Sequence, residues 1–305
     1  MLPFLQRGEF MNCIHCRSAQ FIIRKGFYTR SSDGKRFQRY YCKICNKRFS
    51  ERVWAIDYRY RKRRVYQPIF RSLAKGVSQR TCAFLLDVTR ATIARRVVRF
   101  GKICEHNLNV YRQTRSQTHQ VMFDELETFV HTKCKPLTVP IAVEAGTRKV
   151  LALRVGSIAA KGKLAEISRR KYGPRKCQRR QLLNQLLKDL KNCTHKKTVF
   201  HTDKSQHYSK PIKYHFPMAT HKTTKGRRGC VVGQGELKRG GHDPLFSLNH
   251  TYAMFRDNLK TLSRRTWCTV KKVENFRYLL FIYAWLHNQW VEKGPKRNKI
   301  FLTRL

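Results

Sequence analysis

The chain has 305 residues, with 66 Lys and Arg against 18 Asp and Glu, so its formal net charge is +48. Hydrophobic residues make up 41% of the sequence, which excludes a wholly disordered chain because enough apolar side chains are present to form a core. So basic a sequence indicates a polyanionic partner, and nucleic acid is the leading candidate. The sequence has no run of eighteen apolar residues, so we expect no membrane-spanning helix and no membrane partner.

The first residues, 1–7, lack the apolar length and the cleavage site of a signal peptide. This predicts an intracellular protein, cytoplasmic and associated with the nucleoid. In a reducing compartment, the eleven cysteines are expected to be metal ligands and small apolar residues rather than disulfide partners.

Two Cys-x2-Cys pairs lie near the start of the chain, Cys13 with Cys16 and Cys42 with Cys45. Four thiolates at this double spacing can surround one structural Zn²⁺ ion tetrahedrally while the intervening residues form a β-hairpin, with its turn at 32–34. We interpret residues 11–52 as a zinc ribbon. The alternative, four reduced cysteines paired by coincidence, is uncommon at such a specific spacing.

Residues 65–105 have the pattern of three short helices. Gly76 is expected to end the first helix, and Ser78 and Thr89 are expected to cap the second and third. The arrangement is typical of a helix-turn-helix, although an ordinary helical linker has a similar pattern. The third helix would present these residues to DNA: Arg90, Thr92, Arg95, Arg96 and Arg99.

From about residue 117 the sequence favours strands. Three antiparallel strands are predicted at 120–130, 137–144 and 149–155, followed by helices at 163–172 and 181–190 and a buried strand at 198–203. A loop-rich basic insertion, 208–243, precedes two further helices, 248–263 and 274–290. This order predicts an α/β fold with a ribonuclease-H-like catalytic domain at 117–292, preceded by the zinc ribbon and the helical module.

Two scarce acids occupy informative places in this order. Asp124 lies in the first strand and Asp203 ends the fourth, where a ribonuclease-H-like domain carries its catalytic acids. Carboxylate oxygens suit Mg²⁺ or Mn²⁺, and a pair of such ions can cleave a phosphodiester. We therefore predict that Asp124 bridges two ions and that Asp203 holds one. The alternatives are a surface position for Asp124 and a turn-forming role for Asp203; Glu125 and Glu127 are expected to face solvent.

The chain resembles the transposases of the insertion-sequence-one family over residues 12–288. The resemblance is carried by the two cysteine pairs, the helix-turn-helix, the motif Phe-Asp124-Glu-Leu-Glu-Thr-Phe-Val, the motif His-Thr-Asp203 and the basic segment 256–272. It implies an enzyme that cleaves and joins double-stranded DNA at the ends of its own mobile element and at a target. It also implies a homo-oligomer on paired ends.

The third catalytic residue departs from the family pattern. In that family a Glu lies on the same helix just before the basic segment, and the corresponding residue here is Asn249, which has no charge and cannot act as a base. Three explanations are open: Asn249 assisted by His250, a loop carboxylate from Glu236 or Asp243, or an inactive copy. The spacing from Arg256 favours Asn249.

The basic segment is predicted to place several cations on one helical face, where they would bind the phosphates of the transposon ends. These residues are Arg256, Lys260, Arg264, Lys271 and Lys272. The alternative is a solvated charged face. Trp267 and Phe276 are predicted to pack in the core rather than to stack on bases.

Two other functions are consistent with parts of the sequence. One is an inactive or domesticated transposase that acts as a sequence-specific DNA-binding protein, which the departure at Asn249 leaves open. The other is an RNA-binding zinc-ribbon protein of the translation apparatus, which accounts for the charge and the cysteines but not for Asp124 and Asp203.

Overall fold

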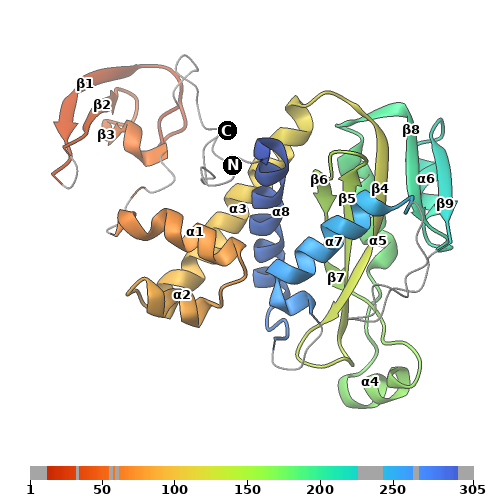
Figure 1. Cartoon of the computed structure of the whole chain (residues 1–305). Coiled ribbons are helices and arrows are strands. Elements are labelled where there is room, and N and C mark those ends of the chain that lie inside the picture. Colours follow the sequence, from red (N-terminus) through yellow and green to blue (C-terminus); the bar gives the residue numbers. More distant parts are fainter. Residues whose placement is uncertain are drawn as a thin grey trace. The chain divides into compact units, whose positions relative to one another are not determined.

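The computed structural model describes residues 12–31, 34–54, 58, 62–225, 243–263 and 268–294 (Figure 1). The chain divides into two compact units, with the boundary between Tyr66 and Gln67. In the part of the chain that is described, no helix has the length and apolar character needed to cross a membrane.

The first unit contains a three-stranded antiparallel sheet in the order β1 (Ile22–Thr29), β2 (Arg36–Cys42) and β3 (Lys47–Ser50), followed by the 3-10 helix η1 (Glu51–Trp54). The predicted hairpin is confirmed, and Gly34 closes it with a φ of 66° that suits glycine. The buried core is small and consists of Cys13, Tyr40, Cys42 and Phe49. A core of this size needs additional stabilisation, which a metal ion can supply.

The 3-10 helix η2 (Arg63–Val65) ends the first unit, and the boundary lies at the start of helix α1 (Tyr66–Ala74). Helices α2 (Gln79–Leu85) and α3 (Arg90–Thr114) follow in the second unit. The predicted caps are confirmed: Ser78 accepts a hydrogen bond from the N–H of Thr81 at 3.0 Å, and Thr89 accepts one from Thr92 at 3.2 Å. Helix α3 extends well beyond the predicted pattern because its second half packs along α8 (Val273–Lys293), a contact that local sequence does not reveal.

The central sheet has the strand order β6-β5-β4-β8-β9, with β7 beside β5. The strands are β4 (Thr118–Phe129), β5 (Pro136–Glu144), β6 (Val150–Leu153), β7 (Gly156–Ser157), β8 (Thr194–Asp203) and β9 (Thr220–Thr224). Strands β4, β5 and β6 are antiparallel, as predicted, whereas β8 is parallel to β4 and β9 is parallel to β8. Three antiparallel strands followed by two parallel ones form the ribonuclease-H-like arrangement, so the predicted α/β fold class is confirmed.

Helices cover both faces of this sheet (Figure 1). Helices α5 (Arg179–Leu190) and α6 (Ser209–His215) lie on one face, where Leu183 and Ile212 share a core with Phe123 and Phe200. Helix α7 (Phe246–Asn258) crosses the other face, and α8 packs against β6. Helix α4 (Leu164–Tyr172) lies in the connection between β7 and α5.

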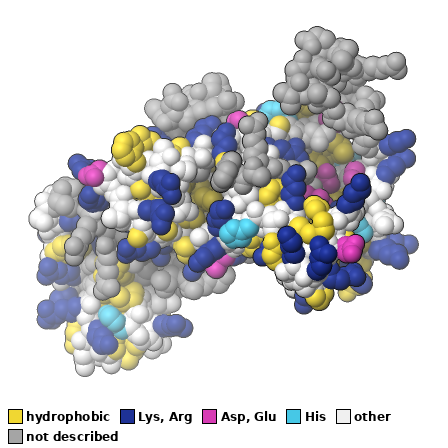
Figure 2. Space-filling view, turned by 90° about the horizontal axis from the view of Figure 1, so that it is seen from below, with side chains coloured by type: hydrophobic (Ala, Val, Ile, Leu, Met, Phe, Trp, Pro, Cys, Tyr) yellow, Lys and Arg dark blue, Asp and Glu magenta, His cyan; other side chains and the backbone are white. Residues whose placement is uncertain are grey.

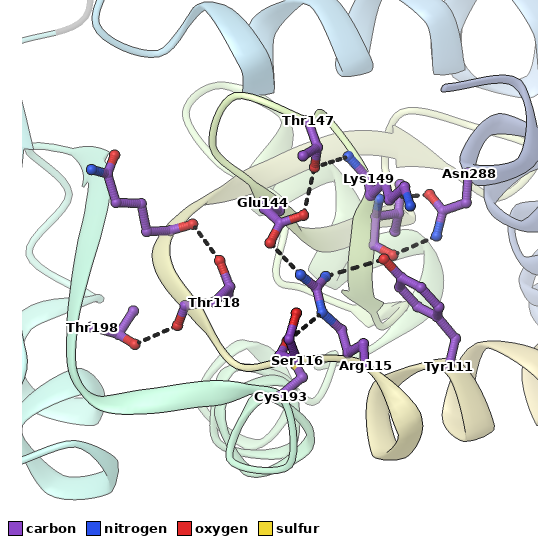
Figure 3. A network of polar contacts seen from close by, with 12 residues as sticks. Tyr111, Arg115, Ser116, Thr118, Glu144, Thr147, Lys149, Cys193, Thr198 and Asn288 are labelled. Atoms are coloured by element: carbon purple, nitrogen blue, oxygen red, sulfur yellow. Dashed lines mark hydrogen bonds and ion pairs between the residues drawn. The ribbon is translucent and has the colours of Figure 1, made fainter. Parts of the chain in front are cut away.

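A polar network fixes the entry into β4 (Figure 3). The guanidinium of Arg115, just after α3, forms an ion pair with Glu144 at the end of β5. Thr147 donates a hydrogen bond to the same carboxylate at 2.6 Å. In α8, Asn288 accepts from the N–H of Val150 at 2.7 Å and donates to its carbonyl at 2.8 Å. The segment that leads into β4 is therefore anchored to the end of β5, and β6 is anchored to α8.

Two predicted regions differ from the structure. The segment after Asp203 was predicted as loop, but α6 and β9 form within it. Strand β9 lies at the sheet edge and carries Thr and Lys rather than alternating apolar residues, so its sequence has no strand signal. Helix α7 ends at Asn258, before the predicted end at 263, and the 3-10 helix η4 (Lys260–Leu262) follows.

Candidate functional site

The structure brings Asp124 and Asp203 together. In the parallel pairing of β4 with β8, Met122 lies beside His201. Two residues further along each strand, Asp124 and Asp203 therefore occupy neighbouring positions and point to the same face, because side chains alternate with a period of two. Adjacent strands are about 4.8 Å apart. Strand β8 ends at Asp203, so this pair of acids lies at the tip of a strand.

Asp124 is held by tyrosines from two other elements. Its Oδ1 accepts hydrogen bonds from the N–H of Glu125 at 2.7 Å and from the hydroxyl of Tyr208 at 2.9 Å. The hydroxyl of Tyr252 in α7 donates to the Asp124 carbonyl. Burial, with a contribution from the charge of Asp203, raises the pKa of Asp124 to about 6. A divalent cation placed between the two carboxylates would offset both effects.

One oxygen of each aspartate is left for a ligand. Oδ1 of Asp203 accepts a hydrogen bond from the N–H of Ser205 at 2.9 Å, as Oδ1 of Asp124 does from its own partners. Within the described residues, no hydrogen bond reaches Oδ2 of either aspartate. Two carboxylate oxygens on one face fit a hard divalent cation such as Mg²⁺ or Mn²⁺.

The third catalytic residue stays a prediction. Asn249 is exposed on α7, and its side-chain amide donates to Asp243 at 2.9 Å. His250 lies with its ring nitrogens 3.3 and 3.4 Å from the Arg148 guanidinium, and burial together with Arg148 lowers its pKa. Among the described residues, no third His, Cys, Asp or Glu lies close enough to Asp124 and Asp203 to complete a metal-binding group with them. Glu236 lies outside the described residues.

Glu125 and Glu127 do not both face solvent as predicted. Arg179 binds both, with its Nε 2.8 Å from Glu125 and its Nη2 3.1 Å from Glu127. The side chain of Glu125 is only 7% exposed and also accepts from Thr138 at 2.7 Å, so its predicted solvent exposure is wrong. By strand alternation, these acids lie on the sheet face opposite to Asp124. Sequence reasoning missed this ion-pair cluster because Arg179 comes from a distant helix.

Tyr208 and Tyr252 are also residues that the sequence analysis missed. Tyr208 lies five residues after Asp203 and packs its ring on Phe123, with ring centroids 5.0 Å apart. The burial of Tyr208 and the nearby charge of Asp124 raise the pKa of this tyrosine, so it stays a neutral donor. No sequence motif distinguishes Tyr208, which follows Asp203, from an aromatic residue that only packs in the core.

The four cysteines form the predicted cluster. Their Sγ atoms all lie within 4.8 Å of one another, with Cys13 to Cys45 at 3.5 Å and Cys16 to Cys42 at 3.6 Å. A Zn–S bond of about 2.3 Å implies a separation of about 3.8 Å between tetrahedral sulfurs, so the group could bind zinc. Backbone N–H groups of Cys45 and Ile44 lower the pKa of Cys42 to about 7, which favours the thiolate that a metal needs.

The helix-turn-helix candidates line the first half of α3, where three of the arginines are exposed and two side chains are half-buried. The exposed ones are Arg90, Arg95 and Arg99, and the half-buried ones are Thr92 and Arg96. Figure 2 shows Lys and Arg spread across the visible face of the molecule, with few acidic side chains among them. Contact of α3 with DNA stays a prediction.

The basic residues after Asn249 do not share one helical face. Arg256 lies near the end of α7, Lys260 lies in η4, and Lys271 precedes α8 with its Nζ 3.0 Å from Thr269. Their predicted common face is therefore wrong, because the helix ends at Asn258. Arg264 and Trp267 lie outside the described residues, whereas Phe276 is buried as predicted.

Comparisons with known proteins find weak likenesses only. No family model matches the sequence, and no curated protein matches it. The catalytic domain of the Mos1 mariner transposase is similar with a TM-score of 0.31 and 14% identity, covering 67% of this chain and 90% of that chain. The Mos1 paired-end complex with the left transposon end gives a TM-score of 0.24 and 14% identity, covering 73% and 75%. The Mos1 catalytic domain with raltegravir and Mg gives 0.25 and 12%, covering 67% and 91%. The fold class is shown by the strand order of the sheet and by the directions of its strands.

Proposed function

We propose that the protein is a transposase of the insertion-sequence-one type, which binds the terminal repeats of its element and catalyses metal-dependent cleavage and transfer of DNA strands. The observation that carries the proposal is the placement of Asp124 beside Asp203, on the same face and at the tip of β8. Burial and the neighbouring charge of Asp203 raise the pKa of Asp124, and a carboxylate perturbed in this way is typical of a functional site.

In this proposal Asp124 and Asp203 would hold Mg²⁺ or Mn²⁺ through their carboxylates. The ions would activate a nucleophilic oxygen and stabilise the leaving oxygen of a phosphodiester. Tyr208 keeps the Asp124 carboxylate in place by binding Oδ1. The third residue is proposed to be Asn249, with His250 beside it.

The segments proposed to bind DNA are separate from Asp124 and Asp203. We propose a zinc ribbon at 11–52 and a helix-turn-helix at 65–105 that together recognise the terminal repeats, and a catalytic domain at 117–292 that carries the basic insertion 208–243. The surface of the chain, basic along its whole length, suits double-stranded DNA. We also propose that the protein acts as a homo-oligomer on paired ends of the element.

A nicking assay tests the proposal. A supercoiled plasmid that carries the terminal repeats is incubated with the protein and Mg²⁺ or Mn²⁺. Asp124→Asn and Asp203→Asn are each expected to lower the nicking rate by a factor on the order of 10³ or more, because a neutral amide holds a divalent ion poorly, while binding of the repeats is retained. Glu166→Gln, at an exposed position of α4, is the matched control. Nicking by both aspartate variants at the wild-type rate would contradict the proposal.

The same assay identifies the third catalytic residue. If Asn249 ligates a metal, Asn249→Ala reduces nicking and Glu236→Ala does not. If Glu236 supplies the ligand, the loss in Glu236→Ala matches that in Asp203→Asn. Asp243→Asn is an informative further variant because Asp243 accepts the Asn249 amide and would position it.

The second candidate function is a DNA-binding protein without catalysis. The observation that favours it is the engagement of Asn249 with Asp243, together with the lack of a third metal-binding side chain beside Asp124 and Asp203 in the described residues. Tight binding of the terminal repeats without nicking under any divalent ion would establish this function instead.

A further inference from the structure

A basic groove lies between α5 and α6, on the sheet face opposite to the side chain of Asp124. It consists of two adjoining pockets, of about 900 Å³ and 510 Å³, that share Cys177, Arg180 and Asn184. We name it the α5–α6 groove. We propose that it binds a single strand of DNA.

The charge of the α5–α6 groove favours phosphates. Five cationic side chains line it, and no Asp or Glu does: Lys176, Arg179, Arg180, Lys188 and Lys210. The charge of Arg179 is balanced by Glu125 and Glu127 at its other side. The remaining four cations are available to neutralise the backbone of a nucleic acid strand.

The groove also presents groups that suit unpaired bases. Tyr214 lines it and is 79% exposed, so its ring is open to stacking. Amide side chains that line it, such as Gln181 and Gln206, can donate to and accept from base edges. A positively charged groove with an exposed aromatic ring is the arrangement that binds single strands without strict sequence preference.

The exposed aromatic ring favours a single strand over a duplex. The bases of a duplex are already stacked on one another, whereas unpaired bases can stack on Tyr214. Gln206 and His207 lie in the turn between Asp203 and α6 and line the groove, so it begins three residues from a proposed metal ligand.

The choice of DNA over RNA rests on the proposed function, whereas binding of a single strand to the groove requires no catalysis. The test is therefore made without added divalent ions, on the full chain with its zinc. Fluorescence anisotropy measures the binding of an oligothymidylate of about ten nucleotides across a range of salt concentrations. A failure of nicking leaves this measurement unaffected.

The groove variant is Arg180→Ala/Lys188→Ala/Lys210→Ala, and its control is Arg169→Ala/Arg170→Ala/Lys171→Ala. The control removes the same charge from exposed positions of α4. The groove variant is expected to bind at least ten-fold more weakly and to reduce the slope of log K against log salt by about 2, since each phosphate contact on a single strand contributes about 0.7. The control is expected to keep the wild-type slope. Equal losses in both variants would overturn the proposal.

Two further measurements locate the strand. Tyr214→Ala is expected to weaken binding by about ten-fold through lost stacking. Cys177 is exposed in the groove, so the oligonucleotide is expected to slow its alkylation by iodoacetamide, as read from its peptide by mass spectrometry. An unchanged alkylation rate at saturating oligonucleotide, or tighter binding of an oligouridylate RNA than of the DNA, would overturn the assignment.

Discussion

Tyr208 contacts both the apolar core of the second unit and the proposed metal site. Its ring packs on Phe123 while its hydroxyl donates to Oδ1 of Asp124 at 2.9 Å. Tyr208→Phe keeps the packing and removes the donor. Because that hydrogen bond stabilises the charged carboxylate, its loss raises the pKa of Asp124 further.

We expect Tyr208→Phe to require a higher Mg²⁺ concentration for half-maximal nicking and to lower the rate by about ten-fold, the cost of a lost hydrogen bond to a charged group. Its unfolding free energy should change little. A Mg²⁺ titration of nicking, beside urea unfolding, checks both statements. Tyr172→Phe, at an exposed position of α4, serves as the matched control, and an unchanged Mg²⁺ dependence in Tyr208→Phe would contradict the positioning role.

His287 makes stability depend on pH. The side chain is buried in α8, with its Nε2 3.0 Å from the Arg148 carbonyl, and burial lowers its pKa to about 4. In the unfolded chain the imidazole has its usual pKa of about 6.5, so between these values the unfolded state binds a proton that the folded state excludes. Its contribution to stability is therefore present above about pH 6.5 and is lost as the pH falls toward 4, by about 3 kcal/mol.

Urea unfolding at pH 7 and pH 5 checks this expectation. His287→Asn should be destabilised at pH 7 but should lose less stability than the wild type between the two values. His207→Asn, at an exposed position, should follow the wild type. The same pH dependence in His287→Asn and in the wild type would rule out His287 as its source.

At the scale of elements, the contact between α3 and α8 depends on Gly101. A Cβ at this position would lie 2.2 Å from the Cβ of Tyr278 in α8. Gly101→Ala should therefore destabilise the protein by about 1–3 kcal/mol through overpacking, although alanine normally stabilises a helix interior by about 1 kcal/mol. Denaturant unfolding measures the sign. The double variant Gly101→Ala/Tyr278→Ala should recover part of the loss, whereas a stabilised Gly101→Ala would show that the helices are not in close contact.

Elements with a local signal were predicted well, and elements without one were missed. Ser78 and Thr89 cap their helices because an N-cap depends on a residue and its next three neighbours. Strand β9 was missed because an edge strand pairs through its backbone and needs no apolar alternation. The second half of α3 was missed because its length follows from packing against α8.

At the scale of the whole molecule, the two units have different sources of stability. The first unit has a small core beside four clustered cysteines, whereas the second has a large apolar core on both faces of a sheet. Removing zinc with a chelator is expected to unfold the residues around the cysteines while the second unit keeps its thermal transition. Limited trypsin digestion with peptide mapping checks this, because cleavage within residues 12–54 should become rapid.

Cys13→Ser should reproduce the effect of the chelator, since one lost thiolate opens the tetrahedral site. Cys177→Ser, at an exposed position outside the cluster, is the matched control. Metal analysis should find one zinc per chain in the wild type. If trypsin cleaved residues 12–54 equally with and without chelator, the cluster would not be what stabilises this unit.

The sequence by itself determined the features that depend on short stretches of chain. The cysteine spacing, the helix caps, the alternating strands and the positions of Asp124 and Asp203 at particular points of their strands are all local patterns. The succession of three strands, helices and a further strand along the chain was enough to predict the α/β fold class, although the sheet order β6-β5-β4-β8-β9 differs from the chain order.

Only the tertiary structure decided which side chains surround the two aspartates. The register of β4 against β8, the approach of Tyr208 and Tyr252 to Asp124, and the groove between α5 and α6 all join residues that are distant in sequence. Such contacts depend on how complementary surfaces pack together, and a sequence pattern describes only one surface at a time. For the same reason Glu125 was predicted to be solvated but lies buried against Arg179.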